Sequence, residues 1–216
     1  MTRLLAWLLP LLLAACASAP PPPDWKLNAQ GALEAHHGHY LDGHTRLADL
    51  SYAKARAEVA RTGRPDLAAR VALARCGVRA AALVFDDCPD YRAVAEAAAA
   101  TERHYAGFLS GDWTGVEAAA LPEAYRPLLA RPEVATLAEV RDPVSRLIGA
   151  GVLFRQGRLP PEGLTLAIDT ASEQGWRRPL LAWLGVALAR AREAGDSPAV
   201  ARLTARIALV ESAQLR

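Results

Sequence analysis

The chain has 216 residues, of which 52% are hydrophobic but only 6% aromatic. Without a short leader about 200 residues remain, enough for one domain with a substantial core. The apolar content is mostly small side chains such as alanine, which favours helices packed closely on helices. Lysine and arginine number 25 against 23 aspartate and glutamate residues. This near balance argues against a nucleic-acid-binding protein, which needs a concentrated basic face to neutralise phosphates.

The N-terminus is typical of a secretion signal that ends at a cysteine. A positively charged start precedes an apolar run from Leu4 to Leu13, which is too short to span a bilayer as a stable helix. The run leads into Leu13-Ala14-Ala15-Cys16, which resembles the lipobox of bacterial lipoproteins. The alternatives are an ordinary secretory signal that happens to contain a cysteine, or an apolar leader of a cytosolic protein.

The lipobox resemblance implies a processed and lipidated mature protein. Residues 1–15 would be removed as a signal peptide, and Cys16 would carry a diacylglycerol on its thiol and an acyl chain on its amine. Several acyl chains give durable anchoring, because each buried methylene contributes about 0.8 kcal/mol. In this family an aspartate after the cysteine retains the protein in the inner membrane, and here that residue is Ala17. The resemblance therefore points to the outer membrane of a Gram-negative cell, with the domain on the periplasmic side.

A proline-rich stretch follows the cysteine. Pro20 to Pro23 are four consecutive prolines, which favour an extended polyproline helix. We interpret residues 16–27 as the lipidated cysteine and its tether, and residues 28–216 as a single folded domain.

The rest of the chain predicts an all-α fold. Apolar residues recur at three- and four-residue spacing between short breaks, and no stretch shows sustained period-two alternation. The predicted helices cover residues 29–42, 45–61, 65–84, 90–109, 113–119, 122–130, 133–139, 142–156, 161–174, 178–194 and 197–214.

Three glycines mark predicted turns between antiparallel helices. Gly43, Gly111 and Gly195 each follow one helical pattern and precede another, as glycine does at a helix C-terminus. We expect antiparallel helical hairpins, stacked as a short irregular array or packed as a compact bundle without a groove.

Around two of these turns the spacing of residues is similar to that of the tetratricopeptide repeat. The positions that carry this resemblance are Tyr40, Gly43, Ala48, Tyr52, Lys54 and Ala55 at the first turn, and Trp183, Leu184, Gly185 and Ala187 at the last. Small residues at Ala48, Ala55 and Gly185 would let helix backbones approach closely. The resemblance is degenerate, because the repeat expected in between is replaced by the single helix 65–84. It implies a curved helical array whose inner surface holds a partner.

The role expected of the other two cysteines depends on the cellular compartment in which the domain lies. With Cys16 lipidated, Cys76 and Cys88 would stay in an oxidising periplasm, where a disulfide is the natural inference. The bond would pin the start of one helix to the helix before it. A redox-active pair is the alternative, but the spacing is not Cys-x-x-Cys.

Four of the five histidines lie within nine residues: His36, His37, His39 and His44. Neutral imidazoles on one side of a helix can bind zinc or copper, and a pH-sensitive interface is a second reading. A solvated or interface-facing helix is the simpler alternative, because no Glu accompanies a His-x-x-x-His pair.

No catalytic motif stands out in the sequence. It contains no Gly-x-Ser-x-Gly elbow and no glycine-rich phosphate loop. Glu96, Glu102 and His104 lie close in sequence, but we expect them to solvate the exposed face of a helix. We therefore expect no enzymatic activity.

The sequence favours an outer-membrane lipoprotein that acts as a helical adaptor for an unidentified envelope protein. The alternative is a histidine-rich lipoprotein that binds metal or senses pH. Four aromatic residues would contact the partner if they face outward, although core positions are the expected alternative; they are Tyr40, Tyr52, Trp113 and Trp183.

Overall fold

The computed structural model describes residues 21–212 and confirms the all-α prediction. This range contains eleven α-helices, three short 3-10 helices and no strand. The α-helices are α1 (Asp24–Asp42), α2 (Thr45–Ala60), α3 (Pro65–Ala80), α4 (Pro89–Arg92), α5 (Ala100–Ser110), α6 (Arg126–Ala130), α7 (Val134–Glu139), α8 (Pro143–Arg155), α9 (Pro161–Glu173), α10 (Arg177–Glu193) and α11 (Ser197–Ser212). The 3-10 helices are η2 (Ala95–Ala97), η3 (Ala118–Ala120) and η4 (Glu123–Tyr125). The lipobox with Cys16 lies outside the described residues.

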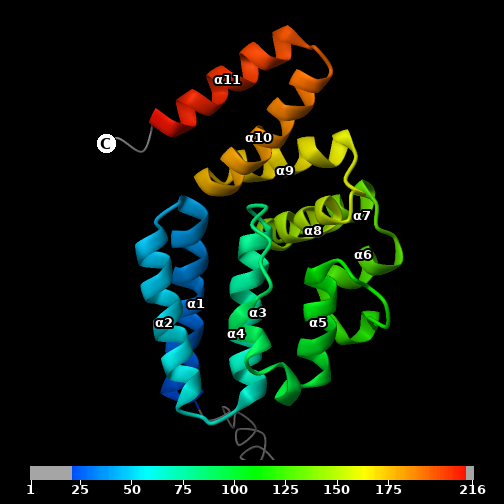
Figure 1. The fold of residues 1–216 in the computed structure, drawn as a ribbon. Coiled ribbons are helices and arrows are strands. Elements are labelled where there is room, and N and C mark those ends of the chain that lie inside the picture. Colours follow the sequence, from blue (N-terminus) through cyan, green and yellow to red (C-terminus); the bar gives the residue numbers. More distant parts are fainter. Residues whose placement is uncertain (1–20, 213–216) are drawn as a thin grey trace, which may run out of the picture.

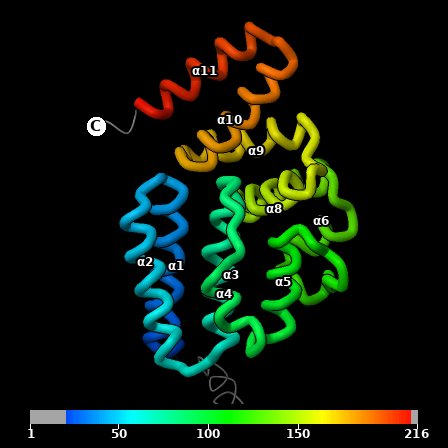
Figure 2. The backbone as a smooth tube through the Cα atoms, viewed as in Figure 1, coloured from blue at the N-terminus to red at the C-terminus, as the bar shows by residue number. Residues whose placement is uncertain are grey.

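The helices form two groups that meet at the end of α3. Helices α1 and α2 lie side by side as a hairpin, α3 packs beside them, and α5 packs on the other side of α3 (Figure 1). Helix α8 crosses α3, and α9, α10 and α11 continue from it as a stack (Figure 2). Helix α11 packs mainly on α10, at the far end of the stack.

Glycine turns end helices where the sequence predicts them. Gly43, Gly111 and Gly195 have φ values of 90°, 79° and 70°, the left-handed conformation that glycine adopts without steric cost. The first and last connect the antiparallel hairpins α1–α2 and α10–α11. The hairpin predicted at Gly111 is wrong, because an irregular segment follows it and only η3, which begins at Ala118, overlaps residues 113–119.

The first helix begins earlier than the sequence predicts. Helix α1 starts at Asp24, so residues 24–27, expected in the tether, belong to the folded domain. Pro23 ends the proline run with a φ of −57°, which suits the position before a helix, and Asp24 places negative charge at its positive end. Pro23 therefore leads directly into α1.

Residues 81–99 differ most from the prediction. Helix α3 ends at Ala80 rather than at residue 84, and the helix predicted for 90–109 is divided into α4, η2 and α5. Leu83 and Cys88 have positive φ values of 59° and 46°, which interrupt a helix and are rare for side-chain-bearing residues. Long-range bonds hold this segment: Cys88 is disulfide-bonded to α3, and the Tyr52 hydroxyl donates to Asp90 Oδ2 at 2.9 Å.

Helices α3 and α8 cross at very close range. Gly151 of α8 packs directly on the Ala80 carbonyl group, and a Cβ atom at residue 151 would lie 2.9 Å from the Ala80 carbonyl carbon. The expected close packing at Ala48 and Ala55 is also found, since both are buried. Gly185 does not serve this purpose: it is exposed, and an added Cβ would meet nothing within 4 Å.

Helix α10 binds the C-terminal ends of α1 and α3. Arg178 Nε donates to the Tyr40 carbonyl at 2.6 Å, and Trp183 Nε1 donates to the Ala81 carbonyl at 3.0 Å. The last carbonyls of a helix have no partner within the helix, and the Trp183 bond satisfies the Ala81 carbonyl, which has no backbone donor in the described range. The Tyr40 carbonyl also accepts from the Gly43 backbone N–H at 3.1 Å, so Arg178 is its second donor. They join the N-terminal hairpin and α3 to the C-terminal stack.

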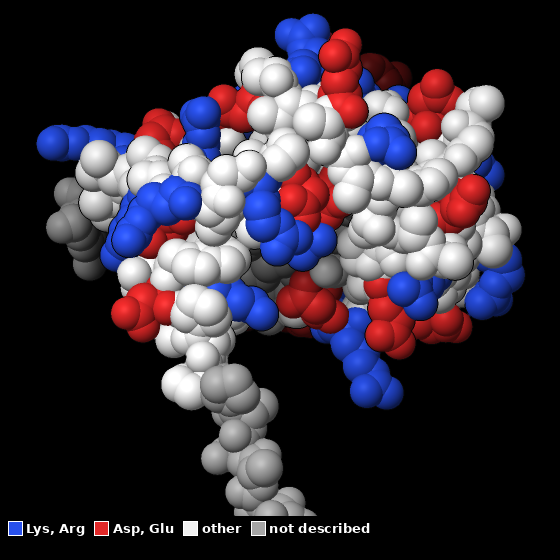
Figure 3. All heavy atoms as spheres, turned by 90° about the horizontal axis from the view of Figure 1, so that it is seen from below, with Lys and Arg blue, Asp and Glu red and all other residues white. Residues whose placement is uncertain are grey.

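The surface shows mixed charge. Basic and acidic side chains are interspersed over the face seen in Figure 3. Among residues 21–212, no helix combines the length and apolar character needed to cross a membrane.

Candidate binding pocket

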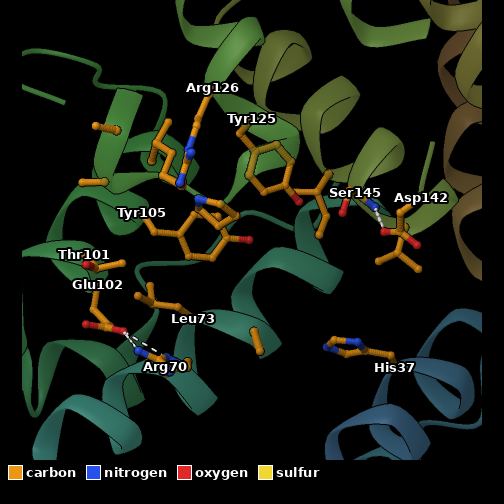
Figure 4. Close-up of a pocket in the computed structure, with 17 residues that line it drawn as sticks. His37, Arg70, Leu73, Thr101, Glu102, Tyr105, Tyr125, Arg126, Asp142 and Ser145 are labelled. Carbon is orange, nitrogen blue, oxygen red and sulfur yellow. Dashed lines mark hydrogen bonds and ion pairs between the residues drawn. The ribbon is translucent and has the colours of Figure 1, made fainter. Parts of the chain in front are cut away.

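A pocket of about 720 Å³ opens between α3, α5 and the start of α8. Its walls come from several separate segments, so only the folded chain creates it. The lining residues are His37, Arg70, Leu73, Ala74, Thr101, Glu102, Tyr105, Ala119, Ala120, Leu121, Pro122, Tyr125, Arg126, Asp142, Val144, Ser145 and Ile148. Most of them are apolar, with polar groups at the edges (Figure 4).

Two tyrosines occupy the middle of the pocket. The rings of Tyr105 and Tyr125 lie 5.7 Å apart and nearly parallel, and Phe108 stacks behind them 4.7 Å from Tyr125. Gly77 makes room for the first of these, because an added Cβ there would lie 3.0 Å from the Tyr105 hydroxyl oxygen. Burial raises the pKa of the Tyr125 hydroxyl to about 12 and raises that of Tyr105 well above its ordinary value. Both rings are therefore neutral aromatic surfaces at any physiological pH.

A buried carboxylate lies at one side of the pocket. Glu102 of α5 is only 3% exposed, and its Oε1 accepts from Arg70 Nε at 3.0 Å and Nη2 at 2.8 Å. The Arg70 side chain is 63% exposed, so the two partners lie in very different surroundings. Glu102 Oε2 is buried without a hydrogen-bond partner in the part of the chain that the structure describes.

The opposite side carries the N-terminus of α8 and a histidine of α1. Asp142 caps α8, since its Oδ2 accepts from the Ser145 backbone N–H at 2.7 Å. His37 lies on the same side, below them in the view of Figure 4. Burial, followed by the charge of His36, lowers the pKa of His37 to about 4. The imidazole is therefore neutral at pH 7.

Comparison with known proteins does not identify a relative of this chain. No protein-family model, curated protein or solved structure matches the chain. The pocket residues and their contacts therefore carry the functional inference.

The structure does not bring the four clustered histidines to one site. His36 is buried, and its Nδ1 donates to the Ala48 carbonyl at 2.8 Å, which ties α1 to α2. His37 lies in the pocket, while the rings of His39 and His44 approach each other at 6.3 Å near the α1–α2 turn. Within residues 21–212 these histidines thus divide among a core position, a pocket and a turn, and this arrangement does not favour the proposed zinc or copper site.

The predicted disulfide is present. Cys76 of α3 and Cys88 are bonded, with their Cα atoms 5.9 Å apart. The two sulfurs and an Asp86 oxygen lie within 4.8 Å of one another, and in the described range this is the one such group of three metal-ligating side chains. Disulfide sulfurs are not thiolates, so this cluster is a structural crosslink rather than a metal site.

Most of the aromatic residues considered for partner contact belong to the core. Tyr40, Tyr52 and Trp183 are buried, which excludes them as an exposed docking surface. Trp113 is partly exposed, but its Nε1 donates to the Phe108 carbonyl at 3.1 Å and its ring stacks on Phe108. The rings that line the pocket, Tyr105 and Tyr125, are different ones.

Glu102 is the pocket residue whose burial differs from the sequence-based expectation. It was expected to solvate an exposed face, as Glu96 does, but it is buried. Glu102, Tyr105 and Leu109 recur at three- and four-residue spacing, and this stripe faces the interior. The position of a charged residue within an apolar stripe was the feature of the sequence that could have indicated its burial.

Proposed function

We propose that the chain is a lipoprotein of the outer membrane, anchored through Cys16, whose helical domain binds another envelope component on the periplasmic side. The pocket between α3, α5 and α8 is the observation that carries the binding role. Ligand-binding sites are typically mostly apolar cavities of about 300–1,000 Å³ with a few polar groups, and this pocket fits that description. The lipobox Leu13-Ala14-Ala15-Cys16 supports the anchor.

The role is that of an adaptor, which holds a partner close to the membrane without a chemical step. The mixed surface charge supports recognition at a defined pocket over general attraction to an acidic polymer (Figure 3). The proline run before α1 supports a spacer between the anchor and the domain.

Site-specific crosslinking in cells tests the binding role. A photoreactive amino acid replaces Ala119, an exposed residue that lines the pocket, or Ala57, an exposed residue of α2 outside it. We expect one crosslinked envelope component with the probe at residue 119 and none at 57, identified by mass spectrometry. Equal products at both positions, or no product at either, would contradict the proposal.

Intact mass tests the anchor separately. Material purified from the native host should lack residues 1–15 and carry the added mass of acyl chains on Cys16. A Cys16→Ser variant should lose this mass and leave the outer-membrane fraction. An unmodified Cys16, or a retained leader, would show that the chain is not a lipoprotein.

A further inference from the structure

The strongest indication of what enters the pocket is the unsatisfied oxygen of Glu102. A buried charged acceptor without a donor costs free energy, and native proteins rarely leave one open. Arg70 donates both of its bonds to Oε1, which leaves Oε2 without a donor among residues 21–212. A ligand that brings an N–H or O–H group into the pocket would satisfy it.

The other charged and polar groups around the pocket point to the same kind of ligand. Asp142 adds a second carboxylate at the exposed rim, where its Oδ2 already accepts from the Ser145 N–H, and neutral His37 has a buried Nε2 without a partner in the described range. Of the two cations, Arg70 is largely in solvent, where its charge is screened. Arg126 is also exposed, and its Nε donates to the Leu121 carbonyl at 2.9 Å. Among the charged groups of the pocket, Glu102 is therefore the buried one, whereas Asp142 and both arginines lie at the solvent-exposed rim.

The tyrosines add a surface that attracts cations. The face of an aromatic ring carries partial negative charge, and a cation within about 6 Å of its centre is stabilised. Tyr105 and Tyr125 are neutral, and both lie between the Glu102 and Asp142 sides of the pocket (Figure 4). Tyr125 is buried against Phe108, so the partly exposed Tyr105 is the ring that a ligand can reach. Leu73 and Ile148 provide an apolar wall beside them.

We propose that the pocket binds an organic ammonium group on an apolar stem, with the nitrogen donating to Glu102 Oε2 and the stem packed against the tyrosines, Leu73 and Ile148. This inference rests on the proposed function in taking the pocket as the binding site, and it adds the chemistry of the bound group. The stem can belong to a free amine or to a lysine side chain of the partner, since both present the same ammonium.

Calorimetric titration of the full-length protein in detergent tests the preference for an ammonium. The probes share one ring size and differ in their polar group: 2-phenylethylamine, 2-phenylethanol and 3-phenylpropionate. We expect the amine to bind about tenfold more tightly than the alcohol, because a hydrogen bond between two charged groups is stronger than one with a neutral partner. Equal affinities, tightest binding of the carboxylate, or no measurable binding of the amine would overturn the proposal.

Matched variants test the role of Glu102. Glu102→Gln keeps the side-chain shape and an oxygen for Arg70, and we expect it to weaken binding of the amine about tenfold. Glu96→Gln removes the same charge from an exposed position and should leave the affinity unchanged. An equal loss in both variants would mean that overall charge, rather than this site, sets the affinity. If Glu102→Gln fails to fold, the order of affinities of the three probes for the unmodified chain still shows whether the pocket prefers an ammonium group.

Competition separates the two sources of the ammonium. If 2-phenylethylamine suppresses the crosslink formed from residue 119, the partner inserts a lysine into the pocket; if the crosslink persists while the amine binds, the ligand is a free amine. A partner missing from the crosslinking experiment would count against the adaptor role, whereas the titration would still test the pocket.

Discussion

The crossing of α3 and α8 allows a sharp test of the packing, through the substitution Gly151→Ala. The new Cβ would overlap the Ala80 carbonyl oxygen and lie 2.9 Å from its carbon, and both are backbone atoms that no rotamer change can move. Carbon atoms in contact lie about 3.5–4.0 Å apart, so the two backbones would have to separate by about 1 Å.

The expected cost follows from two opposing contributions. Overpacking a core costs about 1–3 kcal/mol, and contact with backbone places this site at the upper end of that range. Alanine is a better helix former than glycine by about 0.8–1.0 kcal/mol, which offsets part of the loss. We expect a net destabilisation of about 2 kcal/mol, which lowers Tm by about 4–8 °C for a chain of this size.

Gly185→Ala is the matched control. Gly185 is also within a helix, but it is exposed and an added Cβ would meet nothing within 4 Å. The same substitution should therefore stabilise the protein, and Tm should rise by about 2–3 °C because only the helix-propensity contribution remains. Thermal unfolding followed by circular dichroism compares the two variants. If Gly151→Ala is as stable as Gly185→Ala, the close crossing of α3 and α8 is refuted.

Three further predictions concern other parts of the fold. Burial lowers the pKa of His37 from 6.5 to about 4, so the unfolded chain takes up a proton at a higher pH than the folded chain does. The free energy of unfolding should therefore fall by about 3 kcal/mol as the pH decreases from 6.5 to about 4. Urea titrations across this range should show that dependence on pH, and His37→Gln should reduce it. Reducing the Cys76–Cys88 bond should lower stability by about 3 kcal/mol, and a double serine variant should not respond to the reductant. Trp183→Phe should cost about 2–4 kcal/mol, because it leaves a cavity and the Ala81 carbonyl without its donor; a loss below 1 kcal/mol in chemical denaturation would contradict this contact.

Features with local physical causes could be predicted from the sequence. Glycine at positions 43 and 195 adopts the left-handed conformation that ends a helix, and Pro65 begins α3 because a first-turn residue needs no N–H donor. The Cys76–Cys88 bond also follows from a local relation, since a loop of this length brings two cysteines of a helix and its following turn together.

The segment from 81 to 99 could not be predicted in the same way. Alanine-rich stretches favour a helix, but bonds to distant residues decide the conformation here. Asp90 accepts from Tyr52, which is 38 residues earlier, and it also pairs with Arg56 and Arg75. Such tertiary contacts outweigh helix propensities of a few tenths of a kcal/mol per residue.

The pocket could not be predicted from the sequence for a related reason. Glu102 and its partner Arg70 are 32 residues apart, and the tyrosine at 125 comes from a short irregular segment. Burial of a charged side chain is decided by a partner that no pattern within one helix reveals.

The contacts of α10 with α1 and α3 impose an order on the completion of the fold. The Ala81 carbonyl accepts its hydrogen bond from a residue 102 positions later in the chain, and the Tyr40 carbonyl, which already accepts from the Gly43 N–H, gains a second donor 138 positions later. The α1–α3 unit can assemble early from its neighbouring contacts, but the Ala81 carbonyl lacks a protein donor until residue 183 has been synthesised and has docked. A chain shortened before α10 would lose both closing contacts at once, although every residue of α1 and α3 would still be present.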